Sequence, residues 1–135
     1  MGSGINNIVK LILSPKYAIA SIKRNKLQKK YKVQGLVIGL NSEIVNSTIG
    51  KFVALNFNVV FRNSSIGDHS YVNSNTHVYN TAIGKFCSIG SNVQFGLGMH
   101  PTSMVSTHPA FFSKGKMFKT FSDEVYVEEY SEIVV

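Results

Sequence analysis

Aliphatic and aromatic residues recur at nearly fixed intervals through the middle of the chain. The steps between them are 6, 5, 6, 6, 5, 6, 6, 5, 6 and 6 residues, so the pattern repeats every 17 residues. The motifs Ile49-Gly50-Lys51-Phe52, Ile66-Gly67-Asp68-His69 and Ile83-Gly84-Lys85-Phe86 show this repeat most clearly. The recurring residues, called the aliphatic column below, are Ile38, Ile44, Ile49, Leu55, Phe61, Ile66, Val72, Val78, Ile83, Ile89 and Phe95.

Compact residues form a second series, counted four positions after each aliphatic residue from Ile49 onward. They are Val53, Val59, Ser65, Ser70, Thr76, Ala82, Cys87 and Val93, and Met99 ends the series. Six glycines follow members of the aliphatic column directly, and glycine permits unusual backbone conformations at corners. Asparagine tolerates left-handed dihedral angles, so corners are also expected at Asn56, Asn58, Asn73, Asn75, Asn80 and Asn92.

A period of six residues excludes an α-helix, whose 3.6-residue period would scatter the apolar residues around its circumference. The pattern fits a chain that turns a corner about every six residues, so that three short strands complete one triangular coil. Successive coils would stack at a strand spacing of about 4.8 Å. The sequence therefore predicts an all-β parallel β-helix with the aliphatic column inside, whereas its hand does not follow from the spacing.

The repeats of the form [LIV]-G-x-x-x-x in residues 38–99 resemble those of the left-handed β-helix acyltransferases. Residues 83–112 resemble more specifically the xenobiotic and polysaccharide O-acetyltransferases, which include chloramphenicol and streptogramin acetyltransferases of the hexapeptide type. In that branch a coil like Ile83-Gly84-Lys85-Phe86-Cys87-Ser88-Ile89-Gly90 precedes a loop with a histidine and a Ser-Thr-His-Pro-like stretch. The resemblance implies a left-handed hand, acetyl-CoA as cosubstrate, and a long loop after the third complete coil.

The same resemblance assigns roles to residues of the segment in which the hexad register fails. His100 corresponds by position to the catalytic histidine, which would take the proton of the acceptor hydroxyl as general base. Histidine suits this task because its unperturbed pKa of about 6.5 lies near neutral pH. His108, with Ser106 and Thr107, is expected to bind the acceptor, although a purely structural part for His108 stays open.

Other reactive side chains are expected to be structural. His69 and His77 occupy different hexad positions and are expected on the surface, and Cys87 is expected in the core. The spacing of the four histidines shows no 17-residue repeat, so a zinc site is not expected. Phe111, Phe112, Phe118 and Phe121 are expected to pack the loop, with an acceptor pocket as the alternative.

The net charge of +7 belongs to the N-terminal segment, because residues 1–32 contain eight Lys and Arg and no acid. Residues 5–31 predict two helical pieces, interrupted at Ser14-Pro15, that cap the open end of the solenoid. Peripheral contact of residues 5–32 with anionic lipid is the alternative. No nucleic-acid-binding motif accompanies the charge. The apolar stretch 8–13 is too short to span a membrane, and a cytoplasmic location, with membrane association as the alternative, is expected.

Three segments follow from these observations: a basic helical segment (1–32), β-helix coils (33–99), and an active-site loop that leads into a further coil region (100–135). The family normally adds more coils that supply the coenzyme A groove, so a C-terminally truncated chain or completion by another chain is expected. The acceptor is expected to be a sugar or polysaccharide precursor, with an antibiotic as the alternative, and a homotrimer is expected. The alternative from another class is a non-catalytic β-helix remnant or trimerisation module.

Overall fold

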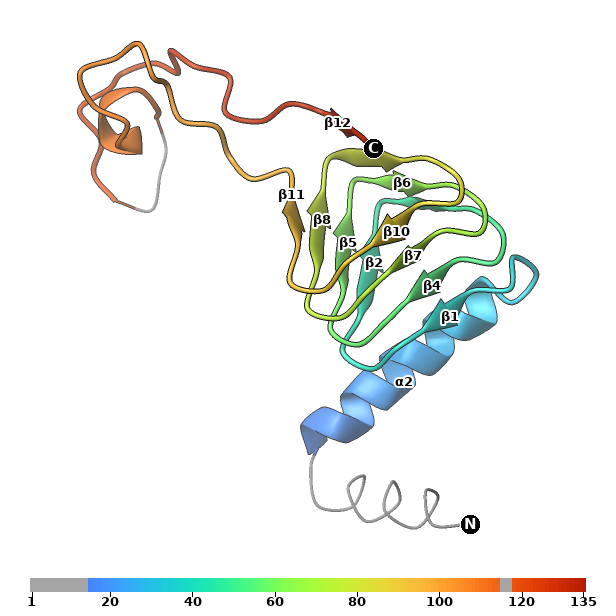
Figure 1. The fold of residues 1–135 in the computed structure, drawn as a ribbon. Coiled ribbons are helices and arrows are strands. Elements are labelled where there is room, and N and C mark those ends of the chain that lie inside the picture. Colours follow the sequence, from blue (N-terminus) through green and yellow to red (C-terminus); the bar gives the residue numbers. More distant parts are fainter. Residues whose placement is uncertain (1–14, 115–117) are drawn as a thin grey trace.

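The computed structural model describes residues 15–114 and 118–135, which form a parallel β-solenoid with one helix at its end (Figure 1). The first predicted helical piece, residues 5–13, lies outside the described residues. Strands join three parallel four-stranded sheets, whose orders are β1-β4-β7-β10, β11-β8-β5-β2 and β12-β9-β6-β3. The chain visits the three sheets in turn, so the predicted parallel β-helix is confirmed.

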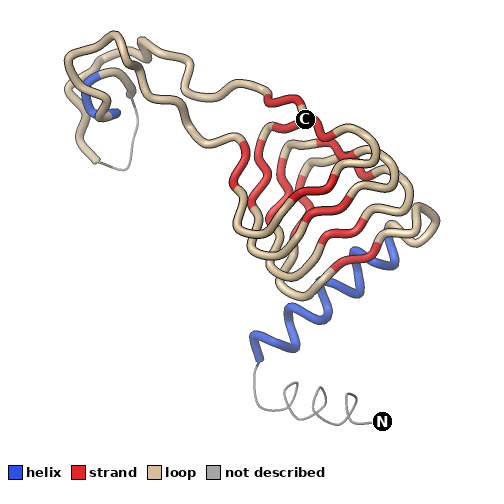
Figure 2. Tube along the Cα trace, in the orientation of Figure 1, coloured by secondary structure: helices blue, strands red, loops and turns tan. Residues whose placement is uncertain are grey.

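The strands are two or three residues long because each spans a single side of the coil (Figure 2). The first sheet contains β1 (Val37–Ile38), β4 (Ala54–Leu55), β7 (Tyr71–Val72) and β10 (Ser88–Ile89). The second contains β2 (Glu43–Val45), β5 (Val60–Arg62), β8 (His77–Tyr79) and β11 (Gln94–Phe95). The third contains β3 (Thr48–Ile49), β6 (Ser65–Ile66), β9 (Thr81–Ile83) and β12 (Ile133–Val134).

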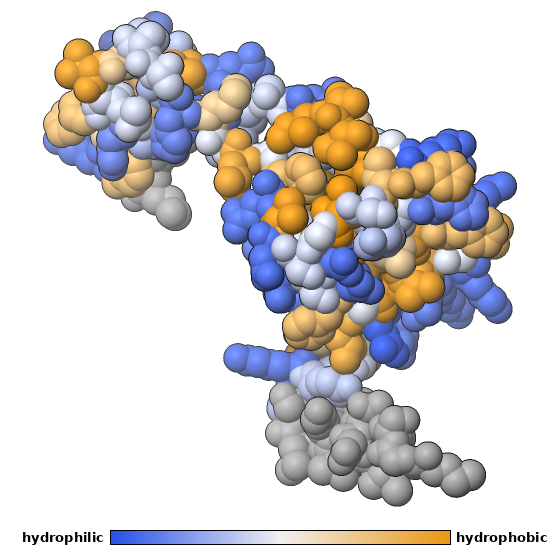
Figure 3. All heavy atoms as spheres, viewed as in Figure 1, coloured by the Kyte–Doolittle hydropathy of each residue, from blue (hydrophilic) through white to orange (hydrophobic). Residues whose placement is uncertain are grey.

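Strand register follows the 17-residue repeat, as in the pairing of Ile38 with Leu55 and of Leu55 with Val72. Nine residues of the predicted aliphatic column are buried, while Ile44 and Phe95 are partly buried against the same core. Side chains on the sheet faces remain mixed in polarity (Figure 3). Phe52, Phe57 and Phe86 are among the exposed apolar residues.

The compact series is correct only in part. Val53, Val59, Ser70 and Thr76 are buried as predicted, but Ser64 and Thr81 are buried in place of Ser65 and Ala82. The inward compact position always lies two residues before the next aliphatic residue. Counting four residues forward therefore fails wherever the step is five residues long.

The predicted reason for the six glycines, an unusual backbone conformation, is correct at Gly96 and wrong at the other five. Gly39, Gly50 and Gly67 do not have positive φ angles, but a Cβ atom on each would lie 2.6 or 2.7 Å from the nearest atom of the next coil. Left-handed corners are instead occupied mainly by asparagine, including Asn58, Asn75, Asn80 and Asn92 as predicted. Asn56 and Asn73 do not have positive φ angles, and the Asn56 amide donates a 2.6 Å hydrogen bond to Asn73.

Helix α2 (Pro15–Lys30) begins at a proline, which is tolerated in a first helical turn. It contacts β1 and β2, and Leu27 packs against the core, so the helix caps the first coil as predicted (Figure 1). No helix among the described residues is long and apolar enough to cross a membrane.

Candidate functional site

Residues 96–132 leave the solenoid between β11 and β12 and form an excursion that projects away from the coils (Figure 1). The departure point is Gly96, whose φ is +71°. A Cβ atom here would lie only 1.9 Å from the carbonyl oxygen of Tyr79, one coil below. Only glycine fits so close to the neighbouring backbone, so Gly96 determines where the excursion begins.

The two legs of the excursion are held together near the solenoid. The Met99 amide donates to the Glu129 carbonyl at 2.7 Å, and the Ser113 hydroxyl donates to the Glu129 carboxylate at 2.6 Å. After the second leg, Ile133 pairs with Thr81, and the chain resumes the third sheet. The excursion therefore replaces one corner of the fourth coil and does not end the solenoid.

The body of the excursion has a small core of its own around Phe112, which is fully buried. Backbone hydrogen bonds join Phe121 to Ala110 at 2.7 Å and Tyr126 to Phe112 at 2.9 Å. The Phe111 and Phe121 rings stack with centroids 5.4 Å apart, although both side chains are half exposed or more. Phe112 therefore packs the excursion, as expected.

His100 is exposed and lies at the base of this body. Its Nδ1 atom is 2.8 Å from the carbonyl oxygen of Thr107, and its ring meets Phe112 edge to face. A carbonyl oxygen can only accept a hydrogen bond, so Nδ1 must carry the proton. In the neutral imidazole the lone pair is therefore on Nε2, and His100 is held as a proton acceptor at that atom.

His108 has the opposite tautomer. It caps the short 3₁₀ helix η1 (Pro109–Phe111), because its Nδ1 accepts a 3.2 Å hydrogen bond from the Ala110 amide. An amide can only donate, so the proton of a neutral His108 is on Nε2. The two histidines thus present different chemistry: Nε2 of His100 can accept a proton, whereas Nε2 of His108 can donate a hydrogen bond.

Ser106 and Thr107 each contact one of the two histidines, and both contacts hold the excursion together. The Ser106 hydroxyl accepts from the His108 amide at 3.1 Å, and Thr107 contributes its carbonyl to His100. Acceptor binding by these residues stays a prediction. A pocket of about 360 Å³ lies next to Ser106 and is lined by Ser103 and by the apolar side chains of Met104, Val105 and Phe111.

Tyr126, in the second half of the excursion, has a pKa above its usual value. Its hydroxyl donates to the Asp123 carboxylate at 2.9 Å, and this hydrogen bond and charge raise the pKa of Tyr126. Because a tyrosine with a raised pKa stays protonated near neutral pH, Tyr126 does not act as a base there.

The remaining reactive side chains lie on the solenoid. Cys87 is half buried at an inward position and packs against the core. His69 is exposed at a corner, and His77 meets Tyr79 edge to face on β8. Within residues 15–114 and 118–135, no three His, Cys, Asp or Glu side chains gather as a metal site would require.

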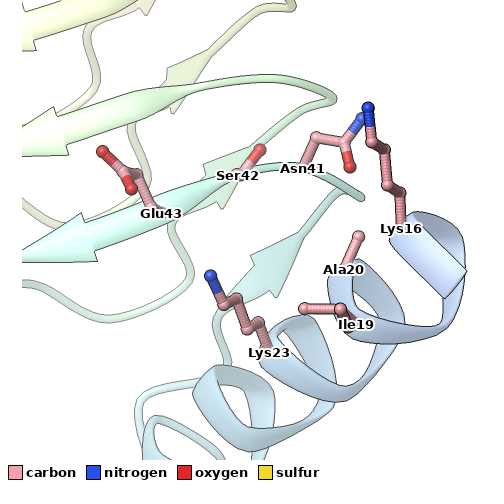
Figure 4. A pocket seen from close by; sticks show the side chains of 7 residues that line it. All are labelled: Lys16, Ile19, Ala20, Lys23, Asn41, Ser42 and Glu43. Atoms are coloured by element: carbon pink, nitrogen blue, oxygen red, sulfur yellow. The ribbon is translucent and has the colours of Figure 1, made fainter.

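Two further pockets lie between α2 and the first coil. The first has a volume of about 300 Å³, with Lys16 and Lys23 facing Asn41 and Glu43 across it (Figure 4). The charge of Glu43 is engaged by Arg62, whose Nε donates to it at 2.6 Å. The groove is therefore basic, and α2, which forms one of its walls, lies at the opposite end of the solenoid from the excursion (Figure 1).

Comparison of the chain with known proteins does not assign it to a family. No protein-family profile matches the chain, and no curated protein or solved structure is significantly similar to it.

Proposed function

We propose that this protein is an O-acetyltransferase, which transfers an acetyl group from acetyl-CoA to a hydroxyl of a saccharide with His100 as general base. The observation that carries the proposal is the 2.8 Å contact between His100 Nδ1 and the Thr107 carbonyl oxygen. This contact holds the imidazole with an unprotonated Nε2, which is the atom that a general base needs.

An alcohol is a weak nucleophile near neutral pH, so its proton must leave as it attacks the thioester carbonyl. In the proposed reaction Nε2 of His100 takes the hydroxyl proton while the oxygen bonds to the acetyl carbon. The carbon–sulfur bond then breaks, and the proton passes from His100 to the departing thiolate. The Thr107 carbonyl stabilises the imidazolium in between, because it already accepts a hydrogen bond from Nδ1.

Two further features support the proposal. The β-solenoid is a fold common among acyltransferases, and residues 83–112 resemble the O-acetyltransferase branch in both the coil and the following histidines.

The test is release of free thiol from acetyl-CoA in the presence of pooled oligosaccharides, measured on this chain and on one extended by further coils. We expect His100→Ala to reduce turnover by about 10²–10⁴-fold, the usual contribution of a positioned base. His69→Asn is the matched control, because it removes a histidine at a left-handed corner outside the excursion. Equal rates for wild type and His100→Ala in both chains would instead support a non-catalytic module.

A further inference from the structure

A groove lies along the corner of the solenoid from which the excursion departs. It consists of two pockets that share Asn63, with volumes of about 250 and 330 Å³. The first descends the corner and is lined by Asn46, Ser64, Ser65, Thr81 and Glu132. The second reaches the root of the excursion and is lined by Tyr79, Asn80, Gly96, Leu97, Gly98 and Tyr130.

We infer that this groove binds the uncharged saccharide whose hydroxyl is acetylated, an inference that rests on the proposed function. Among the described residues that line it, Glu132 is the only charged side chain. The groove therefore lacks the cations that would recognise a phosphate or an acidic sugar. Amides and hydroxyls both donate and accept hydrogen bonds, as a ligand with many hydroxyl groups requires.

Several of these polar groups have no partner among the described residues and are free to bind a ligand. The Asn63 Oδ1 accepts from Asn46 at 2.9 Å, which leaves the Asn63 amide nitrogen as an unused donor. The side chain of Asn80 and the hydroxyls of Tyr79 and Tyr130 make no hydrogen bond within the part of the chain that the structure describes.

The tyrosines add apolar surface to the same groove. Tyr130 is 55% exposed, and its ring lies over Gly98, 3.6 Å from where a Cβ atom would be. Aromatic rings combine a flat apolar face with a polar edge, so they suit sugar rings, which present C–H groups on one face and hydroxyls around the rim.

The position of the groove connects it to the proposed base. Its upper end includes Gly98, and His100 follows two residues later on the same leg of the excursion. A saccharide in the groove would therefore extend from the coils toward His100. The sequence alone does not reveal this site, because its residues are contributed by four coils and the returning leg.

The chain offers a matched pair of variants. Asn63 and Asn75 both have left-handed φ angles, 49° and 59°, and each accepts an amide hydrogen bond from the asparagine one coil below, at 2.9 and 3.0 Å. Asn63→Gly and Asn75→Gly both keep the backbone conformation accessible and remove the same inter-coil bond. Only Asn63 lines the groove. Any loss of stability should therefore occur in both variants, whereas loss of glycan binding should occur only in Asn63→Gly.

The experiment measures binding of the chain to an array of neutral and acidic glycans, with titration of the best-bound neutral glycan followed by saturation-transfer NMR. We expect Asn63→Gly and Tyr130→Ala to weaken binding about tenfold each, as expected for the loss of a hydrogen bond or a stacked ring. Asn75→Gly should bind as wild type does. Absence of binding to every neutral glycan, binding to acidic glycans only, or equal loss in Asn75→Gly would overturn the inference.

Failure of the groove and failure of the enzymatic proposal give different results. Glycan binding that depends on Asn63 and Tyr130, without thiol release from acetyl-CoA, would support the groove and refute the transferase. Acetyl transfer that depends on His100 but has an unchanged acceptor KM in Asn63→Gly and Tyr130→Ala would refute the groove and leave the transferase intact.

Discussion

The imidazole of His69 lies flat on the ring of Phe86, with centroids 5.3 Å apart and planes 2° apart. Phe52 covers the other side of His69 at 5.0 Å, so three rings from successive coils form one column at a corner. All three residues have left-handed φ angles of 57–59°. The other two corners have asparagine at this position, because a bulky residue costs about 1–2 kcal/mol in that conformation.

Phe86→Asn is expected to leave stability nearly unchanged but to weaken self-association. Asparagine relieves the backbone strain of about 1–2 kcal/mol, and this gain offsets the lost stacking of about 0.5–1.5 kcal/mol. Phe86 is 74% exposed, and we expect such apolar residues to contribute to a homotrimer. Light scattering at tens of micromolar should show a trimer for wild type and a smaller species for Phe86→Asn. A wild-type monomer would contradict the expectation.

The stacked column could not be predicted from the sequence, although the core could. The apolar column from Ile38 to Phe95 was readable because burial imposes a strict spacing along the chain. Left-handed corners impose only a backbone angle, and Phe52 and Phe86 reveal nothing of it by residue type. Similarly, a resemblance made His100 a candidate base, whereas its tautomer depends on Thr107, whose carbonyl reaches it only through folding of the excursion.

Buried hydroxyls at inward corner positions join neighbouring coils. The Ser70 hydroxyl donates to the Gly84 carbonyl and accepts from the Cys87 amide, both at 2.9 Å. Ser70→Ala leaves both backbone groups without this partner, so it should lower the free energy of unfolding by about 1–3 kcal/mol. Thr81→Val is the control, because among the described residues the Thr81 hydroxyl bonds only to the Tyr79 carbonyl, two residues away in the same coil. Urea unfolding that shows a larger loss for Thr81→Val would refute the inter-coil role.

Asp68 connects three coils and makes stability dependent on acid pH. Its carboxylate accepts from the Lys51 amide at 2.8 Å and pairs with Lys85 at 2.9 Å, and these contacts lower its pKa below 3.8. A lowered pKa means that the stabilisation is complete above the unfolded-state value and is lost as pH falls through the folded-state value. Melting temperatures of wild type and Asp68→Asn should therefore differ at pH 6 and converge as the pH falls through the folded-state pKa of Asp68. The difference should also shrink in high salt, because the pair is exposed.

The opposite tautomers of His100 and His108 can be measured directly and separate their roles. Nitrogen NMR of the neutral rings should show the proton on Nδ1 of His100 and on Nε2 of His108, because their partners are a carbonyl and an amide respectively. These different proton positions predict different kinetic effects of the two alanine variants. His100→Ala should reduce kcat, since it removes the proton acceptor, whereas His108→Ala should mainly raise the acceptor KM, since it removes a hydrogen-bond donor. A larger fall in kcat for His108→Ala, together with a proton on Nε2 of His100, would reverse the two roles and make His108 the base.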